Sequence, residues 1–430
     1  MEFVEIARER YRRQRGDPAP HMQNLVSAPV HRNEDSPLRV SVTEPVEVLP
    51  GQDERFRPDR VVTFWRGRVA LYAILKALGI GGGHKVVVPG YTCFAVPSAV
   101  CFAGAEAVFA DIEPLTFNVS LETVKSALRT KHPARIKAII IQHTYGTPAD
   151  TSPIVSWARE RGIATIEDCA HVWGSRYRDG AGKWVPAGTL ADASFFSSQW
   201  TKPFSTGLGG WVDTDDPKLR ARLQRFRTED CMAASKGEIA MLAVQIGIRK
   251  LISHPRIDES MKRIYQALYS RGLVVGTSSK EELRGELPSR YAKRMSSFQE
   301  GLLRRSLSDS TVVMHRRRLK AVYDVALEAA GLPVLHVPEG IDPVLLRYPV
   351  RLKNKARVLA EARRRGLEIG DWYSHPIDRP ETLSAEVFGY QPGSCPQGEL
   401  AACEVINLPM SRHVTEKSAY DMVEFLKEFA

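Results

Sequence analysis

The chain has 430 residues, of which 43% are hydrophobic and 26% are charged. This composition is ordinary for a soluble globular protein, and the length suggests two or more domains with a large core. The net charge of +10 favours anionic partners, but we find no signature of a nucleic-acid-binding module, which argues against nucleic acid. The six cysteines lack paired metal-ligand spacing, so we expect no metal site and mostly buried thiols in a reducing, cytoplasmic compartment.

Residues 1–60 are predicted to form an N-terminal arm. Residues 1–17 are rich in arginine and lack the apolar core of a signal peptide. A solvated helix or a frayed end is the simpler interpretation, and a short amphipathic helix on another subunit or a membrane surface is the alternative. Residues 18–58 are rich in prolines and acidic residues, which predicts an extended segment.

From residue 61 onward, apolar runs that favour strands alternate with stretches of helical spacing, which is typical of parallel βαβ units. The sequence therefore predicts an α/β fold, with a large domain at residues 61–330 and a small α+β domain at residues 331–430. The predicted strands of the large domain span residues 61–65, 85–89, 107–112, 137–143, 162–168, 193–196 and 211–212. The predicted helices of its first half span residues 66–78, 92–102, 121–128 and 154–161.

One predicted strand ends in acidic residues, Glu167 and Asp168, with His171 shortly after them. In open α/β sheets, ligands bind at the carboxyl ends of the strands. A carboxylate there can hold a proton on a pyridine nitrogen, which makes the ring an electron sink. On its own, Asp168 could equally cap the next helix.

Another predicted strand is followed by a lysine among aromatic residues. Lys202 comes after Ser197 and Ser198 and lies two residues beyond Trp200. Loss of solvation disfavours the ammonium form, so the pKa of the lysine should fall, and a neutral amine can attack an aldehyde to form a Schiff base. A surface lysine on a loop is the alternative. Pyridoxal phosphate (PLP) requires both an acidic partner and a Schiff-base lysine, so Asp168 and Lys202 together favour a PLP site.

Six motifs occur in a characteristic order along the chain. They are Arg66–Leu71, Val88–Thr92, Val108–Ile112, His143–Gly146, Glu167–His171, and Thr201–Lys202 with Gly207–Gly210. This series resembles the DegT/DnrJ/EryC1/StrS family of PLP-dependent sugar aminotransferases, which have the aspartate-aminotransferase fold type. The resemblance implies a seven-stranded type of sheet between helices, a homodimer, and PLP held by Lys202 and Asp168. It is clear over residues 62–227 and weaker from residue 291 onward.

The resemblance implies that the cofactor phosphate binds where the helix begins at Gly67. The family has Ser-Gly-Thr at this turn, and this chain has Arg66, Gly67 and Arg68. Free backbone N–H groups and the helix dipole favour an anion there, so we expect the amides of Gly67 and Arg68 to contact the phosphate. The two arginines either add charge near a phosphate or face solvent. Ser197 matches the family's phosphate-binding serine, with Ser198 as the alternative if the register differs by one.

The pyridine ring is expected to lie between an aromatic residue and a histidine. The family has the stacking aromatic at the position of Cys93, so Tyr91 or Phe94 is the candidate here, and a core position is the plain alternative for Phe94. His171 matches the family residue on the opposite face of the ring.

Three residues are candidates for substrate contact. His143 matches a family histidine at a strand end, and a hydrogen bond to a loop is its alternative role. Trp200 lies close to the lysine in sequence, and Tyr373 begins a segment that resembles the family's Tyr-Pro-x-Pro. In the glycine-rich loop, Leu208 replaces an acidic residue of the family, so any role of that acid is absent.

Residues 228–288 are least like the family and are predicted to be a helical insertion. The apolar stretch at residues 238–252 is too short to span a membrane, and a basic helical stretch follows at residues 256–271. We favour a buried helix at a subunit interface. An interfacial helix that places basic residues near anionic lipid is the alternative.

Later segments resemble the family more weakly. Ala292 replaces an asparagine that, in the family, reaches the cofactor phosphate of the neighbouring subunit. One long helix is predicted at residues 298–329, with Arg316–Arg318 on its solvated face. In the small domain, strands are predicted at residues 345–352 and 369–375, and helices at residues 355–366 and 416–429.

Together these features predict an aminotransferase that moves an amino group from an amino acid, by resemblance glutamate, to a keto-sugar linked to a nucleotide. Such an enzyme would serve surface-polysaccharide or secondary-metabolite sugar biosynthesis. A different PLP reaction on the same scaffold is an alternative, although the family's dehydratases replace the lysine with histidine and Lys202 argues against them. A non-catalytic scaffold or regulatory protein of this fold, at a membrane surface, is the other alternative.

Overall fold

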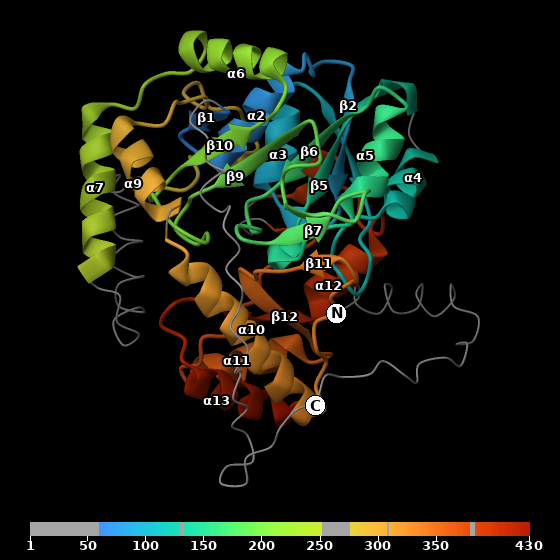
Figure 1. Cartoon of the computed structure of the whole chain (residues 1–430), viewed down its shortest axis with the longest axis vertical. Helices are drawn as coiled ribbons and strands as arrows, with labels where there is room; N and C mark the ends of the chain where they lie inside the picture. Colours follow the sequence, from blue (N-terminus) through green and yellow to red (C-terminus); the bar gives the residue numbers. More distant parts are fainter. Residues whose placement is uncertain (1–59, 130–132, 252–275, 308, 379–382) are drawn as a thin grey trace.

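The computed structural model describes residues 60–129, 133–251, 276–307, 309–378 and 383–430 (Figure 1). Its centre is a seven-stranded sheet with the strand order β1-β10-β9-β6-β5-β2-β4. The strands are β1 (Val61–Phe64), β2 (Lys85–Pro89), β4 (Glu106–Ala110), β5 (Ile136–Gln142), β6 (Ala164–Asp168), β9 (Ala193–Ser197) and β10 (Gly210–Asp213). The pairs from β9 to β4 are parallel, and β10 runs antiparallel to β1 and β9. The predicted α/β class with a mostly parallel sheet is confirmed.

Helices cover both faces of this sheet. The helices on the two faces are α2 (Gly67–Ala77) and α3 (Ala95–Phe102) on one side, and α4 (Leu121–Arg129) and α5 (Thr151–Arg159) on the other. Along β2, Val86 and Val88 point into the core under α2 and α3, whereas Val87 points into the core under α4 and α5. This alternation follows from the two-residue period of a strand.

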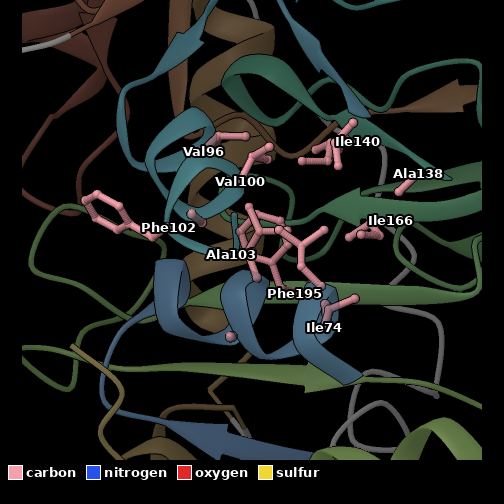
Figure 2. Packing of buried hydrophobic residues seen from close by; sticks show 14 of the residues in the cluster. Ile74, Val96, Val100, Phe102, Ala103, Ala138, Ile140, Ile166 and Phe195 are labelled. Carbon is pink, nitrogen blue, oxygen red and sulfur yellow. The ribbon is translucent and has the colours of Figure 1, made fainter. Parts of the chain in front are cut away.

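The core under α2 and α3 joins the central strands to both helices (Figure 2). In that view, Ile140 and Ile166 from neighbouring strands lie near Phe195 of β9, and Ile74 of α2 and Val100 of α3 close the cluster. All five side chains are at most 3% exposed. This packing fixes the strand ends that carry the candidate site.

The register of the parallel strands brings the candidate residues to one edge of the sheet. Asp168, at the end of β6, is paired with Phe195 of β9 and with Gln142 of β5. Ser197 ends β9 two residues later, and Lys202 follows in the next loop. The carboxyl ends of β6 and β9 therefore lie side by side.

The C-terminal part packs beside the sheet around a core of its own. It contains the antiparallel pair β12 (Arg347–Arg351) and β14 (Val405–Pro409), with α10 (Thr311–Ala329), α11 (Lys355–Arg364) and α13 (Glu416–Lys427) around it (Figure 1). A short parallel pair, β3 (Thr92–Cys93) with β13 (Ile377–Asp378), joins this part to the segment that carries Cys93. The C-terminal part thus reaches the same edge as Lys202 and Asp168.

Several smaller elements complete the described chain. A three-stranded sheet of β7, β8 and β11 was not predicted, because its strands have only two or three residues. The strands of this sheet are β7 (Arg176–Arg178), β8 (Trp184–Pro186) and β11 (Ile341–Asp342). The remaining helices are α6 (Pro217–Glu229), α7 (Lys236–Leu251), α9 (Ser297–Leu307) and α12 (Pro396–Glu404).

Two predicted elements are wrong. The helix expected at residues 298–329 is two helices, since α9 ends at Leu307 and α10 begins at Thr311. Asp309 accepts a hydrogen bond of 3.0 Å from the backbone N–H of Thr311, which favours a new helix start. The strand expected at residues 369–375 forms only an isolated bridge, between Gly370 and Asn407.

The basic run of α10 is not simply solvated. Arg318 is exposed, Arg317 forms a partly buried ion pair with Asp342, and Arg316 is only 6% exposed. The prediction of a solvated face is therefore wrong for Arg316. In a helix, successive residues point about 100° apart, so a run of three cannot share one face.

Within the predicted insertion, α7 packs Leu242 and Ile246 against Trp65 and Leu208. Among the described residues, no helix has the length and apolar character needed to cross a membrane. The N-terminal arm up to residue 59 and the basic stretch at 256–271 lie outside the described residues. All six cysteines are described; none forms a disulfide, and three are buried.

Candidate functional site

Lys202 lies half-buried in the loop between β9 and β10. Its Nζ is 4.8 Å from the centroid of the Trp372 ring, which comes from the C-terminal part. Burial lowers the pKa of Lys202 to about 8, while the nearby Cys93 and Asp168 act in the opposite direction. The lowered pKa predicted from sequence is confirmed. At pH 7, about a tenth of the amine is therefore unprotonated and nucleophilic, far more than for an ordinary lysine.

Asp168 is 5% exposed at the end of β6. Its Oδ1 accepts a hydrogen bond of 3.0 Å from the backbone N–H of Ala170, and its other oxygen makes none to a described residue. Burial raises the pKa of this carboxyl, and the positive charge of Lys202 opposes the shift. One carboxylate oxygen thus remains for a ligand that carries a proton.

His171 contributes a buried ring on the same side. Its centroid lies 4.7 Å from that of Trp372, and its Nδ1 has no hydrogen-bond partner among the described residues. Burial, reinforced by the charge of Lys202, holds the pKa of His171 well below its usual value, so the imidazole is neutral. Lys202 and His171 therefore both lie against Trp372, and Asp168 is close enough to act on Lys202.

His143 forms its hydrogen bonds with other parts of the protein. Its Nδ1 accepts from the backbone N–H of Ala149 at 3.0 Å, so its Nε2 donates to Glu167 at 2.9 Å. Glu167 also accepts from the hydroxyl of Tyr177 and from the backbone N–H groups of the loop at residues 188–191. Both ring nitrogens of His143 are thus engaged within the protein, which agrees with the alternative that His143 bonds a loop.

The N-terminus of α2 forms a second part of the site. No side chain in the described part of the chain caps this helix, and its first turn has no acidic residue. A Cβ added to Gly67 would lie 2.9 Å from Cβ of Ser197, and one added to Gly210 would lie 2.4 Å from Cα of Gly67. The two glycines thus allow the helix start to touch β9 and β10. Ser198 is buried and bonds Thr206 instead, so Ser197 is the serine beside the helix start.

The two arginines at this helix start are held by a buried acid. Glu282 is fully buried; its Oε1 accepts from Arg68 at 2.7 Å and its Oε2 from Arg66 at 3.2 Å. Arg68 also donates to Ser278 at 3.0 Å, and Arg66 to the carbonyl of Gly276 at 3.0 Å. The alternative that both arginines face solvent is therefore wrong, because their side chains bind the segment at residues 276–286 beside the start of α2. That they add charge near a phosphate stays a prediction.

The remaining predicted residues lie at the margin of this group. Tyr91 and Tyr373 are buried together, with ring centroids 5.1 Å apart, and the hydroxyl of Tyr91 bonds that of Tyr145 at 2.6 Å. Phe94 packs in the core under α2 and α3. Trp200 packs against α7 and its neighbours. Stacking by Tyr91 and substrate contact by Tyr373 or Trp200 stay predictions.

Sequence reasoning missed Trp372 and Glu282 beside the predicted site residues and gave no role to Glu167. Trp372 directly precedes Tyr373, a candidate for substrate contact, so its position in the sequence could have indicated it. Glu282 lies more than 200 residues from the arginines that it binds, within the segment least like the family. No local pattern in the sequence connects such positions.

Comparisons with known proteins support one family. The model of the "DegT/DnrJ/EryC1/StrS aminotransferase family" matches residues 56–249 and 256–427. The chain is 27% identical over 368 residues to a "Pleiotropic regulatory protein" of Geobacillus stearothermophilus, covering 84% of this chain and 83% of that protein. It is 26% identical over 355 residues to a UDP-2-acetamido-2-deoxy-3-oxo-D-glucuronate aminotransferase of Pseudomonas aeruginosa. This alignment covers 82% of this chain and 81% of that protein.

A solved structure extends this likeness to the fold. The crystal structure of S. venezuelae DesV, in complex with a ketimine intermediate, has a TM-score of 0.63 and 26% identity, covering 86% of this chain and 84% of that one. The family model covers well over half of the chain, including the segments that carry Gly67, Asp168 and Lys202. The chain belongs to the DegT/DnrJ/EryC1/StrS aminotransferase family.

Proposed function

We propose that this protein is a PLP-dependent aminotransferase that takes an amino group from an amino acid, glutamate, and delivers it to a keto-sugar linked to a nucleotide. The observation that carries the proposal is Lys202, a half-buried amine with a pKa of about 8 that shares one sheet edge with the buried Asp168. Membership of an aminotransferase family agrees with this chemistry.

The residues present fit PLP. The uncapped start of α2, with the amides of Gly67 and Arg68 and the hydroxyl of Ser197, would hold the phosphate. Asp168 would bind the pyridine nitrogen, and the neutral ring of His171 would pack on the pyridine face. When bound, PLP supplies an aldehyde and a protonated ring that accepts an electron pair from the substrate carbon.

Each side chain then has a defined task. Asp168 would keep a proton on the pyridine nitrogen. The negative carboxylate and the positive ring nitrogen stabilise each other, which outweighs the cost of burying the carboxylate charge. Lys202, near its pKa at neutral pH, can take a proton from the α-carbon of the donor and return one. The Trp372 ring covers both Lys202 and His171 and excludes water from the reacting atoms.

A nucleotide-linked keto-sugar is the proposed acceptor. The relative from Pseudomonas aeruginosa is named for a UDP-linked oxo-sugar, and a relative from Escherichia coli O157:H7 is named GDP-perosamine synthase, with 39% identity over 165 residues. The net charge of +10 suits a diphosphate ligand. We also propose a cytoplasmic homodimer. Val244 and Ile248 of α7 are apolar and exposed, which supports a subunit interface at the insertion.

The absorption spectrum of the protein with PLP tests this function. We expect a visible band from protein-bound PLP that glutamate shifts to shorter wavelength. Lys202→Ala should lose the band, whereas Lys218→Ala, which alters an exposed lysine, should keep it. A normal band in Lys202→Ala would contradict the assignment.

A regulatory role is the second candidate. The relative from Geobacillus stearothermophilus that aligns over most of both chains is named a pleiotropic regulatory protein. A PLP band that responds neither to glutamate nor to other amino acids would favour this role.

A further inference from the structure

One buried lysine of the C-terminal part binds backbone carbonyls instead of an acid. Lys355, the first residue of α11, is 8% exposed. Its Nζ donates to the carbonyls of Asp371 at 3.3 Å, Tyr373 at 3.3 Å and Ala402 at 2.8 Å. An ammonium group has three N–H donors, so Lys355 uses all of them on backbone carbonyls.

Two of these carbonyls lie on either side of Trp372. The residues between the bridge at Gly370 and the start of β13 belong to no helix or strand, so their carbonyls need partners from elsewhere. The Trp372 ring centroid is 4.8 Å from Nζ of Lys202 and 4.7 Å from the ring centroid of His171. Lys355 therefore fixes the stretch of backbone that places this ring over the site.

The third carbonyl ties the lysine to a helix that is anchored at the sheet. Ala402 lies in the last turn of α12, where carbonyls lack an intrahelical partner and the helix dipole favours a cation. At the other end of α12, two N–H groups of the first turn donate to Asp111, directly after β4, at 2.9 Å each. Lys355 thus joins a helix held at the sheet edge to the segment that carries Trp372.

Packing alone does not explain a charged group at this position. Burial lowers the pKa of Lys355, and the charge of Asp371 opposes the shift. A buried ammonium group has a desolvation cost that an apolar side chain of the same length would avoid. What the ammonium adds is three directed hydrogen bonds, two of which go to the carbonyls that flank Trp372.

We propose that Lys355 is a positioning residue that holds the Trp372 ring against the amine of Lys202. This inference rests on the proposed function, in which Lys202 is the reacting amine. Lys355 acts through the carbonyls beside Trp372, so its effect on Lys202 passes through the ring. Without Lys355, the ring is free to leave the amine, and water and other small molecules reach it.

Direct repulsion between two lysines is a different effect from positioning. The charges that act most on Lys202 belong to Cys93, Asp168, Arg347 and Arg68. A direct effect of the Lys355 charge would persist in a protein without Trp372. An effect that passes through the ring would disappear there, so a double-mutant cycle separates the two.

Trace acetylation of the full chain, before PLP is added, measures access to the amine of Lys202. Acetic anhydride reacts with neutral amines, so rates measured over a range of pH by mass spectrometry give a midpoint and a maximum rate. The maximum rate reports how freely the reagent reaches the amine. The exposed Lys218 corrects for reagent concentration, and Lys85 of β2, which is 7% exposed, reports on loosening of the whole fold.

Lys355→Met keeps the length of the side chain and removes the ammonium group. We expect it to raise the maximum rate of Lys202 about threefold or more relative to the exposed reference, with the buried reference unchanged. Trp372→Ala should raise the rate at least as much, and the double variant no further than Trp372→Ala alone. Lys353→Met, at an exposed lysine two residues earlier, is the matched control and should behave as the wild type.

Three results would overturn the proposal: an unchanged rate in Lys355→Met, a rise at Lys85 as large as that at Lys202, or a further rise when Lys355→Met is added to Trp372→Ala. If Lys355→Met does not fold, Trp372→Ala decides alone. An amine that reacts no faster without the ring is not covered by it, and the positioning role is then excluded.

The proposed function can fail separately, because acetylation requires neither PLP nor an amino donor. If the rates change as expected but glutamate leaves the PLP band unchanged, the positioning role stands and the aminotransferase does not. If glutamate shifts the band while Lys355→Met leaves the acetylation rate of Lys202 unchanged, the function stands and the positioning role does not.

Discussion

At the scale of single residues, the chemistry depends on how two charged groups lose water. Lys202 is driven toward the neutral amine and Asp168 toward the neutral acid, since burial disfavours the charged form of each. Each group partly restores the charge of the other, so neither shift is complete. A protonated ring nitrogen beside Asp168 would add a second positive charge near this carboxyl group and would favour its charged form.

The pH dependence of cofactor uptake reports on Lys202. The neutral amine is the nucleophile, so the rate at which PLP-free protein takes up PLP should rise with pH with a midpoint near pH 8. Stopped-flow absorption between pH 6 and pH 10 measures this midpoint. A midpoint near the ordinary lysine value of about 10.4 would contradict the burial of Lys202.

At the scale of elements, the start of α2 is built around close contacts of backbone and small side chains. Gly67 approaches Ser197 of β9 and Gly210 of β10 so closely that no larger residue fits at the first position of the helix. Among the described residues, no side chain caps the first N–H groups of α2.

Gly67→Ala should therefore disturb both packing and phosphate binding. A Cβ there would lie 2.9 Å from Cβ of Ser197, so the helix start must shift, which we expect to cost about 1–3 kcal/mol of unfolding free energy. Urea denaturation and PLP titration measure the two effects. Gly82→Ala, at an exposed glycine with open space around it, is the control and should change neither.

A second element-scale feature is the buried carboxylate of Glu167. It ties His143 of the β5 end, Tyr177 of β7 and the loop before β9 to the strand that carries Asp168. Both carboxylate oxygens of Glu167 accept hydrogen bonds from these groups, so the network requires two acceptor oxygens at this position.

Glu167→Gln should destabilise the protein by about 1–3 kcal/mol, because an amide nitrogen would face N–H donors in place of one oxygen. The exposed Glu160 offers the control, and Glu160→Gln should stay within about 0.5 kcal/mol of the wild type. Urea unfolding curves compare the variants. Equal stability of Glu167→Gln and the wild type would show that this network contributes little.

At the scale of the whole molecule, one buried acid links the described end of the predicted insertion to the start of α2. Glu282 binds both Arg66 and Arg68, so the segment at residues 276–286 and the start of α2 form one unit. The arginines lower the pKa of Glu282 below its usual value despite burial.

Glu282→Gln should lower the unfolding free energy by about 3 kcal/mol, since two largely buried arginines lose their counter-ion. A lowered native pKa means that the wild type keeps this contribution above the unfolded-state pKa of about 4.3 and loses it as the pH falls further. The difference between wild type and variant should thus shrink in acid. Glu286→Gln, in an exposed pair with Arg284, should have little effect at any pH.

The sequence was enough to predict the α/β fold and to bring Asp168 and Lys202 to one edge of the sheet, because periodic apolar runs mark strands and both residues follow strand ends. Their catalytic roles stay a prediction. It was not enough for Arg316, whose burial depends on where α10 lies against the loop that follows His171. It also missed the break between α9 and α10, where a side chain of Asp309 interrupts an otherwise helical pattern. The division into domains at residues 61–330 and 331–430 stays a prediction.

The central claim is that the amino group of a donor passes to the protein. Mixing the PLP-loaded protein with ¹⁵N-labelled glutamate in a single turnover, followed by mass spectrometry, measures this directly. We predict about one equivalent of 2-oxoglutarate released per chain, with the label retained on the protein-bound cofactor, and neither product with Lys202→Ala. A fully PLP-loaded wild type that releases no 2-oxoglutarate and retains no label would contradict the account.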